Sequence, residues 1–300
     1  MRRHRLSLLI AALVGACIAV ALAGCGSRRA PSAPPRPASS APGPIFPGLS
    51  AGPTPGPAFA SAARSAPEPG RDAAAAARFA RIGLPVYCGA GRRREVSLTF
   101  DDGPGTYTSQ AQRLLRGAGI TATFFLIGRN VIQRPALAAA DARLGEVGDH
   151  TLTHPVLTAL RPPAIATEMS AGLTDVHRAT GAPVLLFRPP YGAVNDAVRA
   201  EAHRLDVPTI VWNVDSRDSL GAGTAAVVHN AEAGLKPGAI ILMHENTPGT
   251  RAGLPLILRA VRRDRLRPVT VAQLLADDPP SLAQLRAGYS GCLAAERHRR

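Results

Sequence analysis

Short apolar segments alternate with helix-like segments from about Pro85 to Ala276, and this alternation limits the folds open to the chain. Candidate strands are Val96–Phe100, Ala122–Ile127, Glu146–Gly148, Val184–Phe187, Thr209–Val214, Ala239–Met243 and Pro268–Val269. Candidate helices are Ser109–Gly117, Ala164–Thr180, Asn195–Leu205, Thr224–Ala233 and Leu254–Arg263. Regular β–α alternation is typical of a parallel sheet. The fold class we predict is therefore α/β, with about seven strands closing into a (β/α) barrel rather than a doubly wound sheet.

The first of these strands ends at two adjacent carboxylates. Val96, Leu98 and Phe100 alternate with polar residues, which predicts a half-buried strand, and Asp101-Asp102 then precede a Gly-Pro turn. Polar residues follow other strands in the same way: Asp149, His150 and His154; Arg188 to Tyr191; Asp215 and Asp218; and His244. Parallel strands bring their carboxyl ends to one rim, so we expect these groups to converge there.

Three of the rim residues have the chemistry of a catalytic metal site. His150 and His154 are four residues apart, so a single turn or tight loop brings both imidazoles to one point. With Asp102 they supply three protein ligands and leave one position open, as catalytic zinc sites do. Imidazole ligands favour zinc, cobalt or another transition metal over magnesium. Pro155 disfavours helix at His154, so we expect a loop ending there.

Two further rim residues suit acid–base chemistry. Arg188 follows an apolar strand, and its guanidinium can hold the carboxylate of Asp101 in a fixed fork. His244 follows the apolar run 239–243 and could serve as a general acid. The alternatives for these two residues are a surface arginine and a structural histidine.

The N-terminal residues 1–25 have the parts of an export signal. Arginines precede an apolar stretch, Leu6–Leu22, and the tetrad Leu22-Ala23-Gly24-Cys25 resembles the bacterial lipobox, whose cysteine carries lipid. We therefore expect an exported protein, anchored through Cys25 to the outer face of the bacterial cell membrane. An ordinary signal peptide, followed by secretion, is the alternative.

The remaining segments divide at composition changes and cysteines. Residues 26–84 are rich in Pro, Ala and Ser and predict a disordered tether, although 72–82 could form a short helix. Residues 85–292 form the predicted catalytic domain, and 293–300 a basic tail. Cys88 and Cys292 are the pair left in an exported chain, so we predict a disulfide between them, with free thiols as the alternative.

The chain is strongly basic, with a formal net charge of +14. Its arginine clusters lack interleaved aromatic residues, so we do not expect nucleic-acid binding. No strand is followed by a glycine-rich phosphate loop, so we do not expect a nucleotide ligand either.

The rim motifs, taken in order, resemble those of the NodB-type polysaccharide deacetylases, carbohydrate esterase family 4. The motifs are Thr99-Phe100-Asp101-Asp102-Gly103-Pro104, His150-Thr151-Leu152-Thr153-His154-Pro155, Arg188-Pro189-Pro190-Tyr191, Asp215-Ser216-Arg217-Asp218 and Leu242-Met243-His244. The resemblance covers about Val96 to Leu275 and implies a distorted (β/α) barrel with a metal-dependent deacetylase activity on acetylated sugars.

The resemblance also implies a role for each rim residue. It makes Asp101 the base and His244 the acid, with Arg188 and Asp215 tuning them. It makes Asp102, His150 and His154 the metal ligands, and it gives an oxyanion contact to the backbone N–H of Tyr191. Leu242 and Met243 are candidates to line the acetyl pocket. Ser219 departs from the family, which usually has a tryptophan there, so substrate preference is open.

We expect the substrate to be an N-acetylated cell-wall or chitin-like polysaccharide, with peptidoglycan favoured because tether and anchor suit a wall polymer. One alternative is an O-acetyl esterase acting on xylan at the same site. Another is a catalytically silent, wall-binding lipoprotein.

Overall fold

The computed structural model describes residues 69–297, with side chains described up to Leu293. The predicted signal peptide, Cys25 and the predicted tether up to residue 68 lie outside the described residues, as do residues 298–300. No helix within residues 69–297 combines the length and the apolar character needed to span a membrane.

The centre of the fold is a parallel sheet. Its strands are β1 (Glu95–Gly103), β2 (Thr123–Leu126), β3 (Glu146–Asp149), β4 (Val214–Asp215), β5 (Ile240–His244) and β6 (Arg267–Pro268). The strand order is β3-β2-β1-β5-β4, and β6 pairs with the first residues of β1. Every pairing is parallel, so the carboxyl ends of the strands lie at one rim, as the alternation predicts.

Single backbone bridges close this sheet into a distorted barrel. Phe187 bridges Asp149, at the end of β3, and also Thr209. The chain from Thr209 continues into β4, which pairs with β5. The predicted strands 184–187 and 209–214 are therefore in their expected places, but they contribute bridges and the short β4 rather than long ladders.

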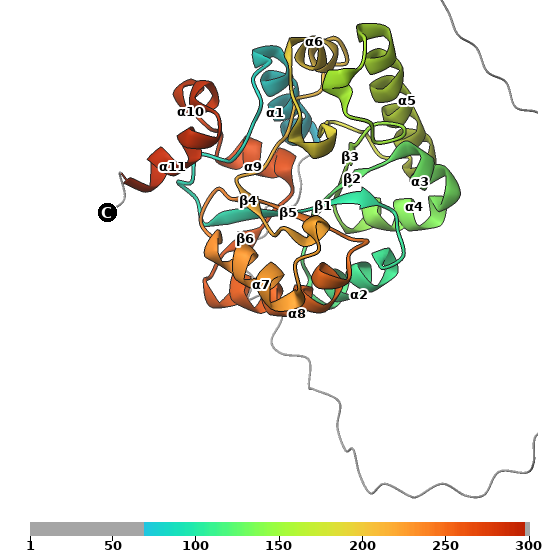
Figure 1. The fold of residues 1–300 in the computed structure, drawn as a ribbon. Helices are drawn as coiled ribbons and strands as arrows, with labels where there is room; N and C mark the ends of the chain where they lie inside the picture. The colour runs from blue at the N-terminus through green and yellow to red at the C-terminus, as the bar shows by residue number, and fades with distance from the viewer. Residues whose placement is uncertain (1–68, 298–300) are drawn as a thin grey trace, which may run out of the picture. The chain divides into compact units, whose positions relative to one another are not determined.

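Helices surround the barrel (Figure 1). They are α1 (Pro69–Ile82), α2 (Thr108–Ala118), α3 (Gly128–Gln133), α4 (Pro135–Leu144), α5 (Pro162–Thr180), α6 (Asp196–Arg204), α7 (Thr224–Ala233), α8 (Pro248–Arg263), α9 (Val271–Asp277), α10 (Leu282–Ala287) and α11 (Tyr289–Arg297). Within residues 69–297, three short 3-10 turns lie in the loops after the strands: η1 (Leu157–Ala159), η2 (Pro190–Gly192) and η3 (Asp218–Leu220).

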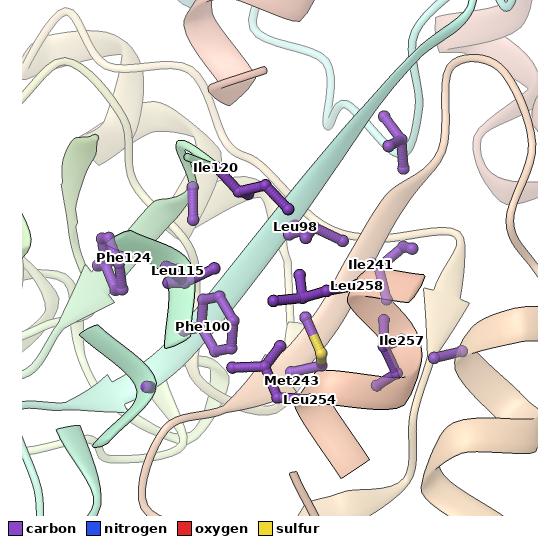
Figure 2. Packing of buried hydrophobic residues seen from close by; sticks show 14 of the residues in the cluster. Leu98, Phe100, Leu115, Ile120, Phe124, Ile241, Met243, Leu254, Ile257 and Leu258 are labelled. Atoms are coloured by element: carbon purple, nitrogen blue, oxygen red, sulfur yellow. The ribbon is translucent and has the colours of Figure 1, made fainter. Parts of the chain in front are cut away.

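The largest apolar cluster lies between the sheet and the helices. Figure 2 shows Leu98 and Phe100 of β1 among side chains that include Leu115 of α2 and Leu254 of α8. The rings of Phe100 and Phe124 stack with their centroids 5.6 Å apart. The other face of β1 carries Ser97, Thr99 and Asp101, which are also buried. Both faces of β1 are thus covered, because its polar face lies inside the barrel; the prediction of a half-buried strand is wrong.

Helix α1 corrects the predicted extent of the tether. Ala75, Ala76 and Phe79 of α1 are buried in an apolar cluster with Leu274 and Leu275 of α9. The small alanine side chains let the two helices approach closely, and Phe79 fills the contact. Residues 69–82 therefore belong to the folded body, and the prediction of a disordered tether is wrong for this part of residues 26–84.

The predicted disulfide is present. Cys88 and Cys292 are bonded, with their Cα atoms 6.0 Å apart across 204 residues of sequence. The bond ties α11 to the segment that precedes β1. Because α11 runs to Arg297, the predicted tail from residue 293 is helical for most of its length.

Candidate active site

The two carboxylates near the end of β1 point in different directions. Its register against β2 shifts between Asp101 and Gly103, and Asp102 has a φ of 67°, in the left-handed region. This irregularity turns Asp101 toward the barrel interior and Asp102 toward the histidine loop after β3. Asp101 therefore pairs with Arg188 and Asp102 lies next to His154, while His150 lies near both carboxylates.

Asp101 is held by a fully buried arginine. One guanidinium nitrogen of Arg188 donates to Asp101 Oδ1 at 2.7 Å and to Thr99 Oγ1 at 2.7 Å. The second terminal nitrogen donates to the carbonyl of Val211 at 3.0 Å. Arg188 therefore contacts Asp101 through one nitrogen rather than through the predicted two-pronged fork. The guanidinium carbon also lies 4.1 Å from the centroid of the Phe125 ring. These contacts fix the two terminal nitrogens and one face of the guanidinium, whereas Nε has no hydrogen-bond partner among the described residues.

The surroundings of Asp101 favour its protonated form more than water would. Burial raises the pKa of Asp101, the charges of Arg188 and His244 lower it, and the net shift is upward. An oriented carboxylate whose pKa is raised is a stronger proton acceptor than an exposed one.

Asp102, His150 and His154 come together as the sequence predicts. The Oδ1 atom of Asp102 lies 3.6 Å from His150 Nε2 and 3.2 Å from His154 Nε2. One ligand atom from each of the three residues lies within 4.8 Å of the others, which makes them a potential site for a divalent metal. As Pro155 predicts, the segment 150–156 has no helix.

The protonation of His150 suits a ligand. Its Nδ1 lies 2.6 Å from the carbonyl oxygen of Arg188, which can only accept, so Nδ1 carries the proton and Nε2 keeps its lone pair. Burial lowers the pKa of His150 to about 3, so the ring is neutral at ordinary pH. Asp102 Oδ1 is buried and has no hydrogen-bond partner among the described residues. A cation at this point would satisfy that oxygen, and these residues therefore fit a divalent metal.

His244 ends β5 and is bonded to Asp218, not to Asp215. His244 Nδ1 lies 2.7 Å from Asp218 Oδ1, and the backbone N–H of His244 donates to Asp218 Oδ2 at 2.7 Å. Asp215 instead accepts a hydrogen bond from the backbone N–H of Arg217 at 2.7 Å. The assignment of Asp215 as the partner of the acid is therefore wrong, because the chain turns at Arg217 (φ 59°) and brings Asp218 back to β5.

Asp218 keeps His244 protonated. Burial lowers the pKa of His244, but the hydrogen bond and charge of Asp218 raise it more, to about 9. Burial likewise raises the pKa of Asp218, but its contacts with His244 and Thr250 bring it to about 2. The pair is thus an imidazolium hydrogen-bonded to a carboxylate. The sequence places Asp218 near the rim, and only the conformation of η3 distinguishes it from Asp215.

Asp101 and His244 both lie close to the cluster of Asp102, His150 and His154. His150 Nε2 lies 3.7 Å from Asp101 Oδ2, and His244 Nε2 lies 4.0 Å from Asp102 Oδ2. The rim therefore combines an oriented carboxylate, three potential metal-ligand atoms and a histidine whose pKa is raised.

Two predicted substrate-contacting residues also lie at this end of the barrel. Tyr191 is in η2 with a left-handed φ of 61°, is 65% exposed, and has its ring centroid 4.8 Å from that of His154. Leu242 is buried and lies two residues before His244 on β5. Met243, by contrast, belongs to the cluster on the helix side of the sheet, so it does not line the rim.

Comparison with known proteins relates the folded domain to a family of enzymes. A family model described as polysaccharide deacetylase matches residues 89–210. A peptidoglycan-N-acetylglucosamine deacetylase of Bacillus cereus is 35% identical over 187 residues, which are 60% of this chain and 87% of that protein. The bifunctional xylanase/xylan deacetylase of Cellvibrio japonicus is 36% identical over 170 residues, which are 55% of this chain and 26% of that protein. The chain thus spans about a quarter of the Cellvibrio protein.

A solved structure gives the same result for the fold. The crystal structure of a CE4-family pseudoenzyme from Bacillus anthracis superposes with a TM-score of 0.61 and 28% identity, over 64% of this chain and 69% of that one. Because the deacetylase of Bacillus cereus is matched over most of its length, the chain belongs to the polysaccharide deacetylase family, carbohydrate esterase family 4, with its distorted (β/α) barrel.

Proposed function

We propose that this protein is a metal-dependent hydrolase that removes acetyl groups from N-acetylated cell-wall polysaccharide and releases acetate. Peptidoglycan is the favoured substrate. The observation that carries the proposal is the convergence at one rim of the Asp101–Arg188 pair, the Asp102–His150–His154 cluster and the His244–Asp218 pair.

The metal ligands are Asp102, His150 and His154, and the metal is zinc, with cobalt or another transition metal as the alternative. Two neutral imidazoles and one carboxylate are a donor set that zinc favours in catalytic sites. A divalent ion held there would supply Lewis-acid activation of a water molecule and of the acetyl carbonyl.

Asp101 is the general base. Its carboxylate accepts the proton of the attacking water, and Arg188 keeps that carboxylate oriented through the contact at 2.7 Å. Arg188 also offsets the negative charge of Asp101 in the barrel interior, where an unpaired carboxylate would be strongly disfavoured.

His244 is the general acid. Asp218 holds Nδ1 at 2.7 Å and leaves Nε2 facing the rim, where it can donate a proton to the departing amine. An amide substrate requires this step, because an amide nitrogen leaves only as a protonated amine. The backbone N–H of Tyr191 is proposed to stabilise the developing oxyanion, and Leu242 to contact the acetyl methyl group.

The proposed substrate and location fit each other. The catalytic domain spans residues 85–292, with α1 added to its folded body, and the preceding residues would tether it to a lipid on Cys25. A protein exported and anchored in this way would meet wall polymers rather than cytosolic metabolites. The name of the Bacillus cereus relative supports peptidoglycan as the substrate class.

Two further functions have some support. An O-acetyl esterase acting on xylan is supported by the name of the Cellvibrio relative. A silent wall-binding lipoprotein is supported by the pseudoenzyme among the structural neighbours. Ser219, which stands where the family usually has a tryptophan, bears on which sugar chain the rim accepts.

Acetate release from three substrates decides among these functions. The zinc-loaded protein is offered peptidoglycan, chitin oligomers and acetylated xylan, with an Asp101→Asn variant as the matched inactive control. Release from an N-acetylated glycan that is lost in the variant supports the proposal. Release from xylan alone would instead identify an O-esterase, and no release from any of the three with zinc bound would favour the binding protein.

A further inference from the structure

The loop that carries the two histidine ligands has an unfavourable backbone conformation. Thr151 and His154 have φ values of 69° and 65°, in the left-handed region that non-glycine residues seldom adopt. Such a loop keeps its shape only when surrounding contacts hold it, so the contacts of residues 149–154 bear directly on where His154 lies.

Contacts within the loop account for part of this support. Asp149 Oδ1 accepts a hydrogen bond from the backbone N–H of Thr151 at 3.0 Å, and Thr151 Oγ1 accepts one from the backbone N–H of His154 at 3.0 Å. Thr153, which directly precedes the second histidine, is held from outside the loop.

That outside support is Glu168, in the second turn of α5. Its two carboxylate oxygens accept hydrogen bonds from the backbone N–H of Thr153 at 2.8 Å and from the Thr153 hydroxyl at 2.7 Å. Its backbone carbonyl also accepts the N–H of Leu152 at 2.9 Å. One helical residue therefore binds two consecutive loop residues through three acceptors.

Gly172, one turn further along α5, shows how closely helix and loop approach. A Cβ atom there would lie 2.3 Å from Asp149 Oδ1 and 2.6 Å from the carbonyl carbon of Thr151. Residues four apart share a helix face, so Glu168 and Gly172 present one surface to the loop. The contact made by Glu168 is thus part of an extended helix–loop contact.

We infer that Glu168 is a positioning residue for the metal site: by holding Thr153 it keeps His154 Nε2 within reach of Asp102 Oδ1, 3.2 Å away. This role rests on the proposed function only in requiring a metal at Asp102, His150 and His154. Glu168 touches neither metal nor substrate, and it acts through the conformation of the loop.

The test measures zinc affinity of the metal-free protein by competition with a chelator, without any substrate. Removing an outer contact of a metal ligand typically weakens binding about 10- to 100-fold, and we expect Glu168→Ala to weaken zinc binding about tenfold. Glu168→Gln keeps one acceptor oxygen, so its zinc affinity should lie between those of the wild-type protein and Glu168→Ala. Thr167→Ala is the matched control, because Thr167 is exposed on α5 and its hydroxyl donates to the carbonyl of Pro163 in the same helix.

Two readouts separate positioning from general destabilisation. Saturating zinc should restore turnover of Glu168→Ala to near the wild-type value. Because Glu168 acts through Thr153, the double variant Glu168→Ala/Thr153→Ala should bind zinc no more weakly than Glu168→Ala alone. Unchanged zinc affinity in Glu168→Ala would overturn the inference and leave the proposed function intact. Wild-type protein that binds no zinc would overturn both.

Discussion

The Nδ1 atom of His244 lies 2.7 Å from Oδ1 of Asp218, and the backbone N–H of His244 donates to the second oxygen of the same carboxylate. The hydroxyls of Thr247 and Thr250 also bond to this carboxylate. Asp218 is thus fixed from several sides, and it fixes both the orientation and the charge of the imidazole.

The first prediction concerns the alkaline limb of the pH profile of kcat/KM. The pKa of His244 is raised to about 9, so the protonated acid is present below that pH and is lost as pH rises through it. Asp218→Asn removes the charge that raises this pKa, so the limb should move toward the ordinary histidine value of about 6.5. The measurement is kcat/KM from about pH 6 to pH 10.

Asp215→Asn is the matched control for this prediction. Asp215 contacts the backbone of Arg217 rather than His244, so its substitution should leave the alkaline limb in place. If the alkaline limb shifted in Asp215→Asn but not in Asp218→Asn, the result would contradict the pairing of His244 with Asp218.

The second prediction separates the base from the metal ligands. Asp101→Asn should retain zinc, because Asp102 and both histidines are untouched, while kcat falls by about 10²- to 10⁴-fold, the usual contribution of a general base. Zinc content after dialysis and acetate release are measured on the same sample. Near-normal turnover in this variant would refute the assignment of Asp101.

The third prediction concerns stability. Arg188→Leu leaves Asp101 buried without its cation, and breaking a buried ion pair in this way typically costs about 3–5 kcal/mol. The free energy of unfolding from urea titration gives the value. Arg199→Leu is the control, because Arg199 pairs with the exposed Asp196 and such surface pairs contribute about 0–1 kcal/mol. If both variants lost the same free energy of unfolding, the Arg188 contact would stabilise the fold no more than the exposed pair does.

The fourth prediction concerns the disulfide between Cys88 and Cys292. It closes a loop of most of the domain, so its reduction should lower the free energy of unfolding by about 2–5 kcal/mol. The next residue, Gly89, bonds to Gly238 before the start of β5, whereas His244 ends that strand. Activity of the folded protein should therefore survive reduction.

Unfolding is followed in urea with and without reductant. The variant carrying Cys88→Ser and Cys292→Ser is the control, and its stability should not respond to reductant. If wild-type stability were equally insensitive, the bond would contribute nothing to the fold.

The rim was predictable because most of its residues lie at or next to the carboxyl end of a strand. Asp101 and Asp102 are near the end of β1, and His244 is the last residue of β5. His150 follows β3, and Arg188 follows the bridged residue Phe187. Parallel strands bring such positions together. Asp218 lies outside this rule. It comes three residues after the end of β4, and it reaches His244 only through a left-handed residue that spacing does not reveal.

The helices show where local patterns fail. The pattern predicts α7 at its observed bounds, but the first turns of α8 were missed because they contain Pro248, Gly249 and Gly253. The structure explains these small residues: a Cβ at Gly253 would lie 2.9 Å from a methyl of Val228 on α7. Close packing of two helices, rather than helix propensity, selects glycine there.

The sequence indicates a short helix at 72–82, but it does not predict that this helix packs on the domain. Its alanine side chains are too small to define an apolar face, so the local composition predicts a tether. Ala76 and Phe79 are buried only because α1 packs against α9. Tertiary packing overrides local composition at such positions.

The most direct test of the account titrates zinc into metal-free protein while acetate release from N-acetylated peptidoglycan glycan is recorded. The account predicts that release rises with zinc and levels off at about one equivalent, as a single three-ligand site requires, and that Asp102→Ala stays inactive over the same range. Release that is independent of added metal, or unchanged in Asp102→Ala, would contradict the central claim that this rim is a metal-dependent active site.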